Sequence, residues 1–435
     1  MVAHTALAGL GARPRALAGA RRRLPRGVRR RLPQALAALA AVLTIACYTQ
    51  TPRPARPPRA EAPATLSIRE EPRVRVALVE AAPELTLALP GAWVVTPDRG
   101  EAVALADQEA VVIRPVADGL ALEASARSVG WPGAKGLTIA PGPAAGRALP
   151  PAFGLGSRRY RGDVRVSRLD DGRLRLVTGV ALEEYLVGVI GHEMPLTWSD
   201  AALHAQAIAA RTYALVNLKP KADHDLKADE RSQVFGGVTA LEARARSIVE
   251  ATRGMVLTWQ GKPFTTYFHS TCGGDTVPAA WIFGAGPGNA LPPLDGASGC
   301  KCQASKVYRW TLEVDLATDA ALRKLVLELP LREVKVEAWP RGGYARTVTF
   351  VDAGGDRVTR PATEVRAAFY PRLKSTAFEV DLDPGGTRLT FRGRGWGHGV
   401  GLCQYGAEGF AKEGLTGEQI LARAYPGAKL ERLGY

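Results

Sequence analysis

Residues 182–218 read LEEYLVGVIGHEMPLTWSDAALHAQAIAARTYALVNL, and this stretch decides the fold of the middle of the chain. Its first part carries apolar residues at the spacing of one helical face, which are Leu182, Tyr185, Leu186, Val189 and Ile190. Pro195 ends that helix, because the residue before a proline disfavours the helical conformation. A second helix begins after Ser199, a good N-cap, and Pro220 stops it. The stretch therefore predicts two helices joined by a short Met-Pro turn.

Glu193 lies beside that turn, on the apolar stripe of the first helix. The step from Leu186 to Val189 to Glu193 keeps the carboxyl on the inward face, in the last helical turn. Burial and the negative end of the helix dipole both disfavour the carboxylate and raise its pKa. A carboxyl of this kind can hold a proton near neutral pH and give it to a leaving group. The alternative is a carboxylate at a frayed helix end, paired with a neighbour such as Arg211.

The rest of the chain predicts an α+β fold in which helices and strands are grouped. Residues 66–150 alternate short apolar runs with turn signals and form a β-rich lobe, and residues 160–179 form a hairpin with Asp-Asp-Gly at its turn. A third helix is expected to begin at Thr239, with Glu242 completing a capping box, and a last helix begins at Thr416 with Gln419. Between these helices the chain mixes strands with short helices.

The 435-residue chain has a net charge of +15, most of it at the N-terminus. Twelve arginines and one glutamate lie before residue 65, which leaves only +4 for the remainder. A nucleic-acid-binding domain would need a basic stripe on its folded part, so no nucleic-acid partner is expected. The arginine-rich leader runs into the apolar segment Gln34 to Ala46, which has the length of a signal h-region, and then into a Pro/Arg-rich spacer.

Cys47 closes that apolar segment as LTIAC, which resembles a bacterial lipoprotein box with Thr44 where leucine is usual. Lipidation at Cys47, an uncleaved membrane anchor and simple cleavage are the alternatives. All three export the body of the protein to the cell envelope or periplasm, with the membrane contacted through this segment alone. The expected organisation is a basic cytoplasmic leader (1–31), a signal or anchor segment (32–48), a linker (49–65), the β-rich lobe (66–150) and a core (151–435).

Four motifs resemble the SpoIID/LytB family, the sporulation stage II D proteins and amidase enhancers. The main one is LEEYLVGVIGHEMP with WSDAALHAQAIAARTYAL, preceded by YRGDVRV. FHSTCGGDT (268–276) resembles the family's His-Ser-x-x-Gly-Gly-x-Thr segment, and GRGWGHGVGLCQYGAEGFAKEGLTGEQIL (393–421) its C-terminal block. The motifs occur in family order from about residue 155 to about residue 430.

The resemblance implies a peptidoglycan lytic transglycosylase. Such an enzyme cleaves the linkage from N-acetylmuramic acid to N-acetylglucosamine, leaves a 1,6-anhydro end and prefers glycan stripped of its peptides. The family's catalytic acid falls on Glu193. One acid/base suffices, since the muramic acid's own C6 hydroxyl attacks, whereas ordinary glycosidases need two carboxylates. Arg211 matches a family arginine and is expected to orient Glu193 or a substrate group, with a salt bridge on the helix surface as the alternative.

The cysteines beyond Cys47 predict a zinc site. His269 and Cys272 form one close pair and Cys300 and Cys302 another, which together make a Cys₃His ligand set. The resemblance implies one His and two Cys ligands in a branch of the family, and of the later pair Cys302 is favoured. Cys403 lies near the metal as a further candidate. A disulfide from Cys272 to Cys300 or Cys302 is the alternative in an exported protein.

The Gly-rich block adds candidate substrate contacts. His398 is expected beside Glu193, and hydrogen bonding within a tight loop is its alternative role. Trp396 is the aromatic residue expected to stack on a sugar, and Ser270 is assigned to substrate binding with it. The expected partners are glycan strands and a cell-wall amidase. A non-catalytic glycan-binding enhancer of that amidase is the alternative function, and a zinc hydrolase, which needs an open metal position, is a third.

Overall fold

The computed structural model describes residues 64–68, 70–125, 127–143, 149, 151–319, 325 and 329–435. Contacts divide the chain into Met1–Glu61 and Ala62–Tyr435, and the description below concerns the second unit. The predicted leader, the signal or anchor segment and Cys47 lie outside the described residues. Among the described helices, none combines the length and apolar character that crossing a bilayer requires.

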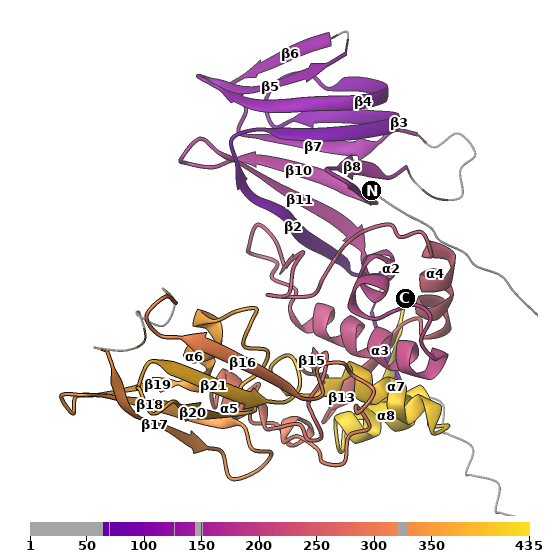
Figure 1. Ribbon diagram of the computed structural model, residues 1–435. Helices are drawn as coiled ribbons and strands as arrows, with labels where there is room; N and C mark the ends of the chain where they lie inside the picture. The colour runs from indigo at the N-terminus through magenta and orange to yellow at the C-terminus, as the bar shows by residue number, and fades with distance from the viewer. Residues whose placement is uncertain are drawn as a thin grey trace, which may run out of the picture. The chain divides into compact units, whose positions relative to one another are not determined.

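An eleven-stranded sheet forms the first part of this unit (Figure 1). Its order is β12 (Leu226–Lys227), β2 (Arg73–Ala82), β11 (Leu174–Ala181), β10 (Asp163–Arg168), β7 (Gly136–Pro141), β3 (Leu85–Pro97), β4 (Val103–Val116), β5 (Gly119–Ala124) and β6 (Arg127–Pro132), with β8 (Phe153–Leu155) and β9 (Arg158–Tyr160) beside β3. The predicted hairpin is confirmed as β10 and β11, which pair antiparallel from Asp163 to Gly179. Because β10 also pairs with β7, the sheet continues across the predicted boundary at residue 150.

Helices follow the sheet directly in the chain, as the apolar periodicity predicts. They are α2 (Leu182–Glu193), α3 (Asp200–Val216), α4 (Glu242–Ala251), and later α7 (Gln404–Lys412) and α8 (Gly417–Ala424), all of which contact α3 or one another. Ser199 is the N-cap residue of α3, although its side chain makes no capping bond. The predicted capping box at Thr416 and Gln419 is present.

The start predicted for the third helix is wrong. Helix α4 begins at Glu242 rather than at Thr239, without a side-chain cap. The carboxylate of Glu242 instead pairs with Arg161 and Arg246, at 3.1 and 2.9 Å. A capping box would need the Glu242 side chain as an acceptor for a backbone N–H, but its carboxylate is engaged in these two ion pairs.

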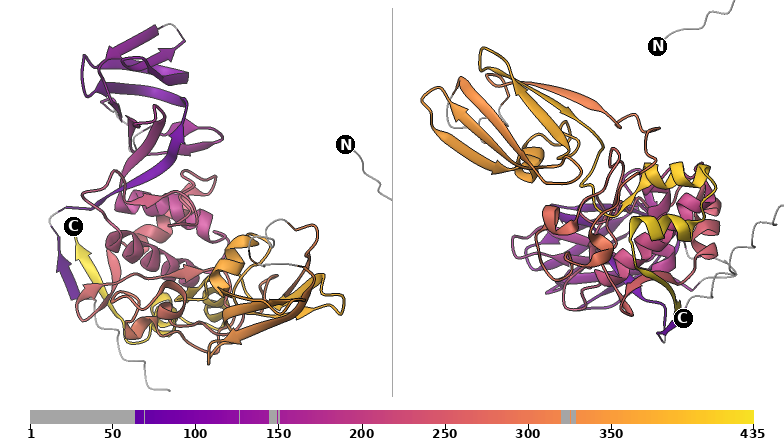
Figure 2. Two further views of the ribbon diagram at one scale, coloured as in Figure 1. Left: turned by 90° about the vertical axis from the view of Figure 1, so that its left-hand side faces the viewer. Right: turned by 90° about the horizontal axis from the view of Figure 1, so that it is seen from below.

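Small sheets complete the unit (Figure 2). One sheet contains β1 (Ala64–Ser67), β23 (Lys429–Gly434), β13 (Met255–Trp259) and β14 (Lys262–Pro263), and a second pairs β15 (Phe268–His269) with β22 (Leu402–Cys403). A third contains β16 (Trp310–Asp315), β21 (Arg388–Gly393) and β20 (Phe378–Leu382), and a fourth contains β17 (Leu331–Ala338), β18 (Ala345–Asp352) and β19 (Arg357–Pro361). The short helices α5 (Ala279–Phe283) and α6 (Ala362–Ala368) and a 3₁₀ turn at Pro292–Leu294 lie between these strands in the chain. Parallel pairing of β1 with β23 joins the beginning of the unit to its end.

The two largest hydrophobic clusters among the described residues hold these elements. The larger core unites the big sheet, the helices and the strands around β13. The smaller one lies within residues 310–391, between β16–β21 and α6, and we call this segment the insert. The mixed α+β class predicted for the chain is therefore confirmed, and the described residues of the insert combine β-strands with the short helix α6.

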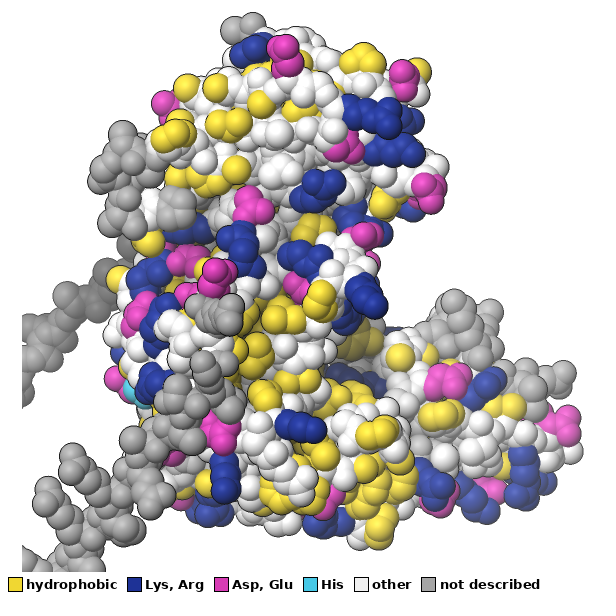
Figure 3. Space-filling view, turned by 180° about the vertical axis from the view of Figure 1, so that it is seen from behind, with side chains coloured by type: hydrophobic (Ala, Val, Ile, Leu, Met, Phe, Trp, Pro, Cys, Tyr) yellow, Lys and Arg dark blue, Asp and Glu magenta, His cyan; other side chains and the backbone are white. Residues whose placement is uncertain are grey.

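The charged side chains on one face of the molecule are mixed in sign. In Figure 3, Lys and Arg side chains alternate with Asp and Glu over this face, without a continuous basic stripe. This distribution agrees with the small net charge of the sequence after residue 65.

Candidate functional site

Glu193 is the last residue of α2, as predicted from the apolar stripe. Leu182, Leu186 and Val189 of that stripe are completely buried. Met194 then leaves the helix in an extended conformation, and its N–H still donates to Ile190 at 3.1 Å. The carboxyl group is consequently held on a rigid helix end rather than on a loop.

Two donors fix the carboxyl group of Glu193. The backbone N–H of Val234 donates to Oε1 at 2.7 Å, and Nε2 of Gln404 donates to Oε2 at 3.2 Å. Burial raises the pKa of Glu193, while both hydrogen bonds favour the charged form and lower it. Burial prevails, so the pKa lies above the usual carboxyl value, which is the direction predicted from the sequence.

Glu193 faces a cavity of about 670 Å³, within the range of small-molecule sites. The lining residues come from α2, α3, the loop before Val234, β15, the Gly-rich block and the insert: Glu193, Tyr213, Glu230, Arg231, Ser232, Val234, Tyr267, Phe268, His269, Ser270, Phe283, Thr363, Arg366, Ala367, Tyr370, Trp396, Gly397, His398 and Gln404. Segments more than 200 residues apart in the chain thus meet around one acid. Of the predicted site residues, His269, Ser270, Trp396 and His398 lie in this wall together with Glu193.

His398 is held by the backbone on both sides of its ring. Nε2 donates to the carbonyl oxygen of Phe268 at 2.9 Å, and Nδ1 accepts from the N–H of Val400 at 3.1 Å. Burial lowers the pKa of His398 well below the usual histidine value, so the ring is neutral. With both nitrogens engaged, His398 shapes the wall, which is the tight-loop role left open by the sequence.

Trp396 and Ser270 occupy the same wall in different ways. The Trp396 side chain is 37% exposed, and Nζ of Lys374 lies 4.7 Å from its ring centroid. Its backbone forms an isolated antiparallel bridge with Thr271, and Trp396 is one of the residues that line the cavity. Ser270 contacts Thr271 through its hydroxyl at 3.3 Å. A partly exposed aromatic ring of this kind can stack on a sugar face.

Arg211 lies elsewhere. Its side chain is completely buried, and Nε and Nη2 donate to the two carboxylate oxygens of Glu183 at 2.9 and 2.7 Å. Nη1 donates to Met255 O at 3.1 Å and Nη2 to Val249 O at 3.3 Å. Arg211 does not line the cavity, and its donors serve this buried ion pair, which joins α2, α3, α4 and β13. Arg211 therefore forms an ion pair, as in the alternative to the orienting role, but this pair is buried and does not lie on the helix surface.

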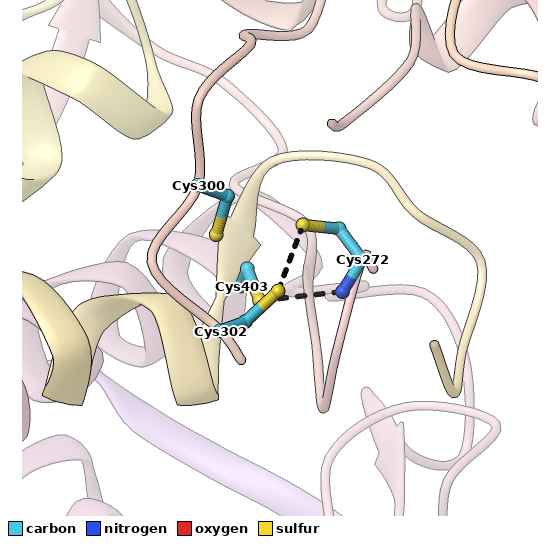
Figure 4. A group of neighbouring side chains, drawn as sticks. All are labelled: Cys272, Cys300, Cys302 and Cys403. Carbon is cyan, nitrogen blue, oxygen red and sulfur yellow. Dashed lines mark hydrogen bonds between the residues drawn. The ribbon is translucent and has the colours of Figure 1, made fainter. Parts of the chain in front are cut away.

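Four cysteines converge on one another (Figure 4). The Sγ atoms of Cys272, Cys300, Cys302 and Cys403 lie within 4.8 Å of one another, with Cys272 and Cys302 3.6 Å apart. A tetrahedral zinc ion with bonds of about 2.3 Å to four sulfurs places those sulfurs about 3.8 Å apart, so the cluster fits such an ion. The thiols are free and buried. These four residues can hold a metal.

Backbone N–H groups surround the sulfurs as they do in thiolate sites. The N–H of Cys272 and that of Gly406 each donate to Sγ of Cys403 at 3.3 Å, and the N–H of Gly274 donates to Sγ of Cys272 at 3.4 Å. Gly406 is required here, because a Cβ at this position would lie 2.2 Å from Sγ of Cys300. Donors aimed at sulfur favour the thiolate that binds a metal.

The fourth member of this cluster is Cys403, not His269 as the Cys₃His prediction has it. Nδ1 of His269 donates to Val400 O at 3.0 Å, and its Nε2 is buried without a partner among the described residues. The ring lies 5.2 Å from that of His398 and lines the cavity. Four sulfur ligands would close the metal site, which disfavours the zinc hydrolase, since that chemistry needs an open position.

The cysteine cluster is connected to the acid through β22. Parallel pairing sets His269 beside Cys403, and Gln404 is the next residue. A metal in the cluster would therefore fix the strand pair that presents Gln404 to Glu193. This link is through the backbone and involves no contact between the metal and a substrate.

Sequence reasoning missed several lining residues. Gln404, Glu230, Arg366 and Tyr370 all face the cavity, and the hydroxyl of Tyr370 donates to Glu230 at 3.0 Å. Gln404 follows Cys403 within a motif that was recognised, so its position was a usable signal. Glu230 lies in a polar loop and Arg366 in the insert, where no local pattern distinguishes them from surface residues.

Comparison with known proteins gives two family models and several relatives. A model described as Stage II sporulation protein matches residues 170–259, and one described as a domain of unknown function matches residues 293–401. Stage II sporulation protein D of Bacillus subtilis (strain 168) is 30% identical over 288 residues, which cover 58% of this chain and 75% of that protein. A protein of Brachyspira hyodysenteriae described as uncharacterized is 30% identical over 285 residues, covering 64% and 74%. The Amidase enhancer of Bacillus subtilis (strain 168) is 28% identical over 288 residues, covering 56% and 40%.

Proposed function

This chain belongs to the stage II sporulation protein D family, and from that premise we propose that it is an enzyme, a lytic transglycosylase that cleaves peptidoglycan glycan strands. The observation that carries the proposal is Glu193, a carboxyl with a raised pKa at a rigid helix end that faces a cavity. The bond cleaved would be the one from C1 of N-acetylmuramic acid to the oxygen of the next N-acetylglucosamine. The product would be a 1,6-anhydro end.

Glu193 would act first as an acid and then as a base. The protonated carboxyl gives its proton to the glycosidic oxygen, which leaves with the electron pair of the C1–O bond. The C6 hydroxyl oxygen of the same muramic acid then bonds to C1, and the Glu193 carboxylate takes the hydroxyl proton. The carboxyl is restored and no water is consumed.

The two hydrogen-bond partners of Glu193, Val234 and Gln404, would play different roles in this cycle. Oε1 accepts from a backbone N–H, which can only donate, so Oε2 is the oxygen suited to carry the proton. Gln404 faces Oε2 and can present its NH₂ to the carboxylate or, after a half-turn of the amide, its oxygen to the acid. Trp396 would support the sugar ring at the edge of the cavity. Zinc, held by the four cysteines, would supply structural stability only, by fixing β15 against β22.

A second carboxylate favours hydrolysis as a second candidate. Glu230 lines the same cavity as Glu193, and glycosidases that use water need such a pair. One relative is named Amidase enhancer, and this name supports the non-catalytic alternative, in which the cavity binds glycan for a cell-wall amidase. That alternative does not require the acid at position 193.

The site of action follows from the N-terminal sequence. We propose that the basic leader and the apolar segment export the body of the protein to the cell envelope, where glycan strands are found. The mode of attachment, through Cys47 or through the uncleaved segment, is part of the same proposal.

The test compares the full chain with Glu193→Gln on peptide-stripped glycan, with products identified by mass spectrometry. The wild type should release fragments lighter by one water than hydrolytic products, and Glu193→Gln should release none. Glu250→Gln, a change in a half-exposed carboxylate on α4, is the matched control and should retain activity. Ordinary reducing ends would support hydrolysis with Glu230. Binding without release by either protein would favour the enhancer.

A further inference from the structure

The insert contributes one wall of the cavity through α6. Thr363, Arg366, Ala367 and Tyr370 of this segment face the space that contains Glu193. Val365 and Phe369, on the other side of the same segment, are buried in the core of the insert. Arg366 therefore lies on a helix held by the core of the insert, and just after that helix the hydroxyl of Tyr370 donates to Glu230, which also lines the cavity.

Arg366 has hydrogen-bond donors that are not used within the described residues. Its Nε donates to Lys374 O at 3.2 Å, and within the described part of the chain Nη1 and Nη2 have no acceptor and the guanidinium has no carboxylate partner. The other arginine of the cavity, Arg231, pairs with Glu80 and Asp229. Burial lowers the pKa of Arg366, which reflects a cation removed from water without a counter-ion.

An unpaired, partly buried guanidinium whose two terminal nitrogens are free is suited to bind a planar carboxylate or a phosphate in a bidentate manner. A muramic acid without its peptide carries such a group, the carboxylate of its lactyl ether. When the peptide is attached, that carbon is an amide, which has no charge to offer and leaves the cation unpaired.

We propose that Arg366 is a specificity-determining residue that binds the free lactyl carboxylate of peptide-stripped muramic acid. The inference rests on the proposed function, because it takes glycan strands as the ligand of the cavity. It assigns a role to part of the segment that matches a domain of unknown function. The insert then selects the substrate, while α2 supplies the acid.

The test measures binding in the Glu193→Gln chain, so that cleavage does not interfere. The ligands are a tetrasaccharide of alternating N-acetylglucosamine and N-acetylmuramic acid with free lactyl groups, and the same compound with these groups converted to methylamides. Calorimetry should give a Kd at least about tenfold lower for the free acid, as expected for a charge-assisted pair. Adding Arg366→Gln should raise the Kd for the acid to that for the amide and leave the amide unchanged, whereas Arg366→Lys should keep part of the preference.

Arg346→Gln is the matched control, since Arg346 lies on β18 of the insert, half-exposed and outside the cavity lining. It should bind both ligands like the parent, and thermal melting should show that all variants fold. Equal affinity of the parent for acid and amide, absence of binding, or a preference that survives Arg366→Gln would overturn the inference. If the wild type cleaves nothing, the proposed catalysis fails, yet the binding comparison still decides the role of Arg366.

Discussion

Replacing Arg211 by methionine should destabilise the fold strongly rather than impair substrate binding. The side chain is completely buried and Glu183, its partner, is 5% exposed. Methionine would leave a buried carboxylate without its cation, and it would remove the hydrogen bonds that Arg211 donates to the carbonyl oxygens of Met255 and Val249. Breaking a buried pair from one side costs about 3–5 kcal/mol in free energy of unfolding. In urea, with an m value of about 3 kcal/mol/M, the midpoint should fall by about 1 M or more.

Urea unfolding followed by circular dichroism measures this cost, with Arg244→Met as the matched control. Arg244 pairs with Asp200 at the surface, so its loss should cost about 0–1 kcal/mol. The double change Glu183→Leu with Arg211→Met should regain much of the loss, because no unpaired charge stays buried. A single variant that unfolds within about 1 kcal/mol of the wild type but fails to cleave glycan would refute this reasoning and restore the substrate-orienting role.

The same pair has a pH signature. Burial raises the pKa of Glu183, but the charge and hydrogen bonds of Arg211 outweigh it and hold the pKa below the usual value. A lowered carboxyl pKa stabilises the fold at pH values above about 4.3, the usual glutamate value, and this contribution is lost as the pH falls through the lowered pKa. The difference in unfolding free energy between the wild type and Arg211→Met should therefore shrink in acid, and a difference that grows would contradict the assignment.

Two further predictions concern the acid and the cysteine cluster. Gln404→Leu removes a hydrogen bond that lowers the pKa of Glu193, so the alkaline limb of the kcat/KM profile should move to higher pH. Gln303→Leu, a change outside the cavity, should leave the alkaline limb in place. A move of the limb to lower pH in Gln404→Leu would exclude the proposed contact between Gln404 and Glu193. Cys403→Ser should lower the zinc content measured by plasma mass spectrometry from about one ion per chain and lower the melting temperature. A chelator should destabilise the wild type and a thiol reductant should not, and the reverse pattern would indicate a disulfide.

Periodicity and capping patterns were sufficient for the elements that depend on near neighbours in the chain. The apolar stripe predicts α2, its end at Pro195 and the inward position of Glu193, and the Asp-Asp-Gly turn predicts the hairpin of β10 and β11. These features arise from hydrogen bonds and burial within a few residues. The same reasoning failed at Thr239, because ion pairs of Glu242 with Arg161 and Arg246 prevailed over a local cap.

The composition of the site depends on contacts that no local spacing records. Pairing of β15 with β22 brings Cys403 to Cys272 across 131 positions, and it directs His269 toward the cavity instead. Packing of the insert places Arg366 in the wall of the cavity that contains Glu193, where its Nη1 and Nη2 have no acceptor among the described residues. The sequence by itself determined the acid, its helix and the family motifs, since those lie within continuous segments. Tertiary structure decided which distant side chains share the cavity, the sulfur cluster and the Arg211 ion pair, because strand register and core packing set these distances.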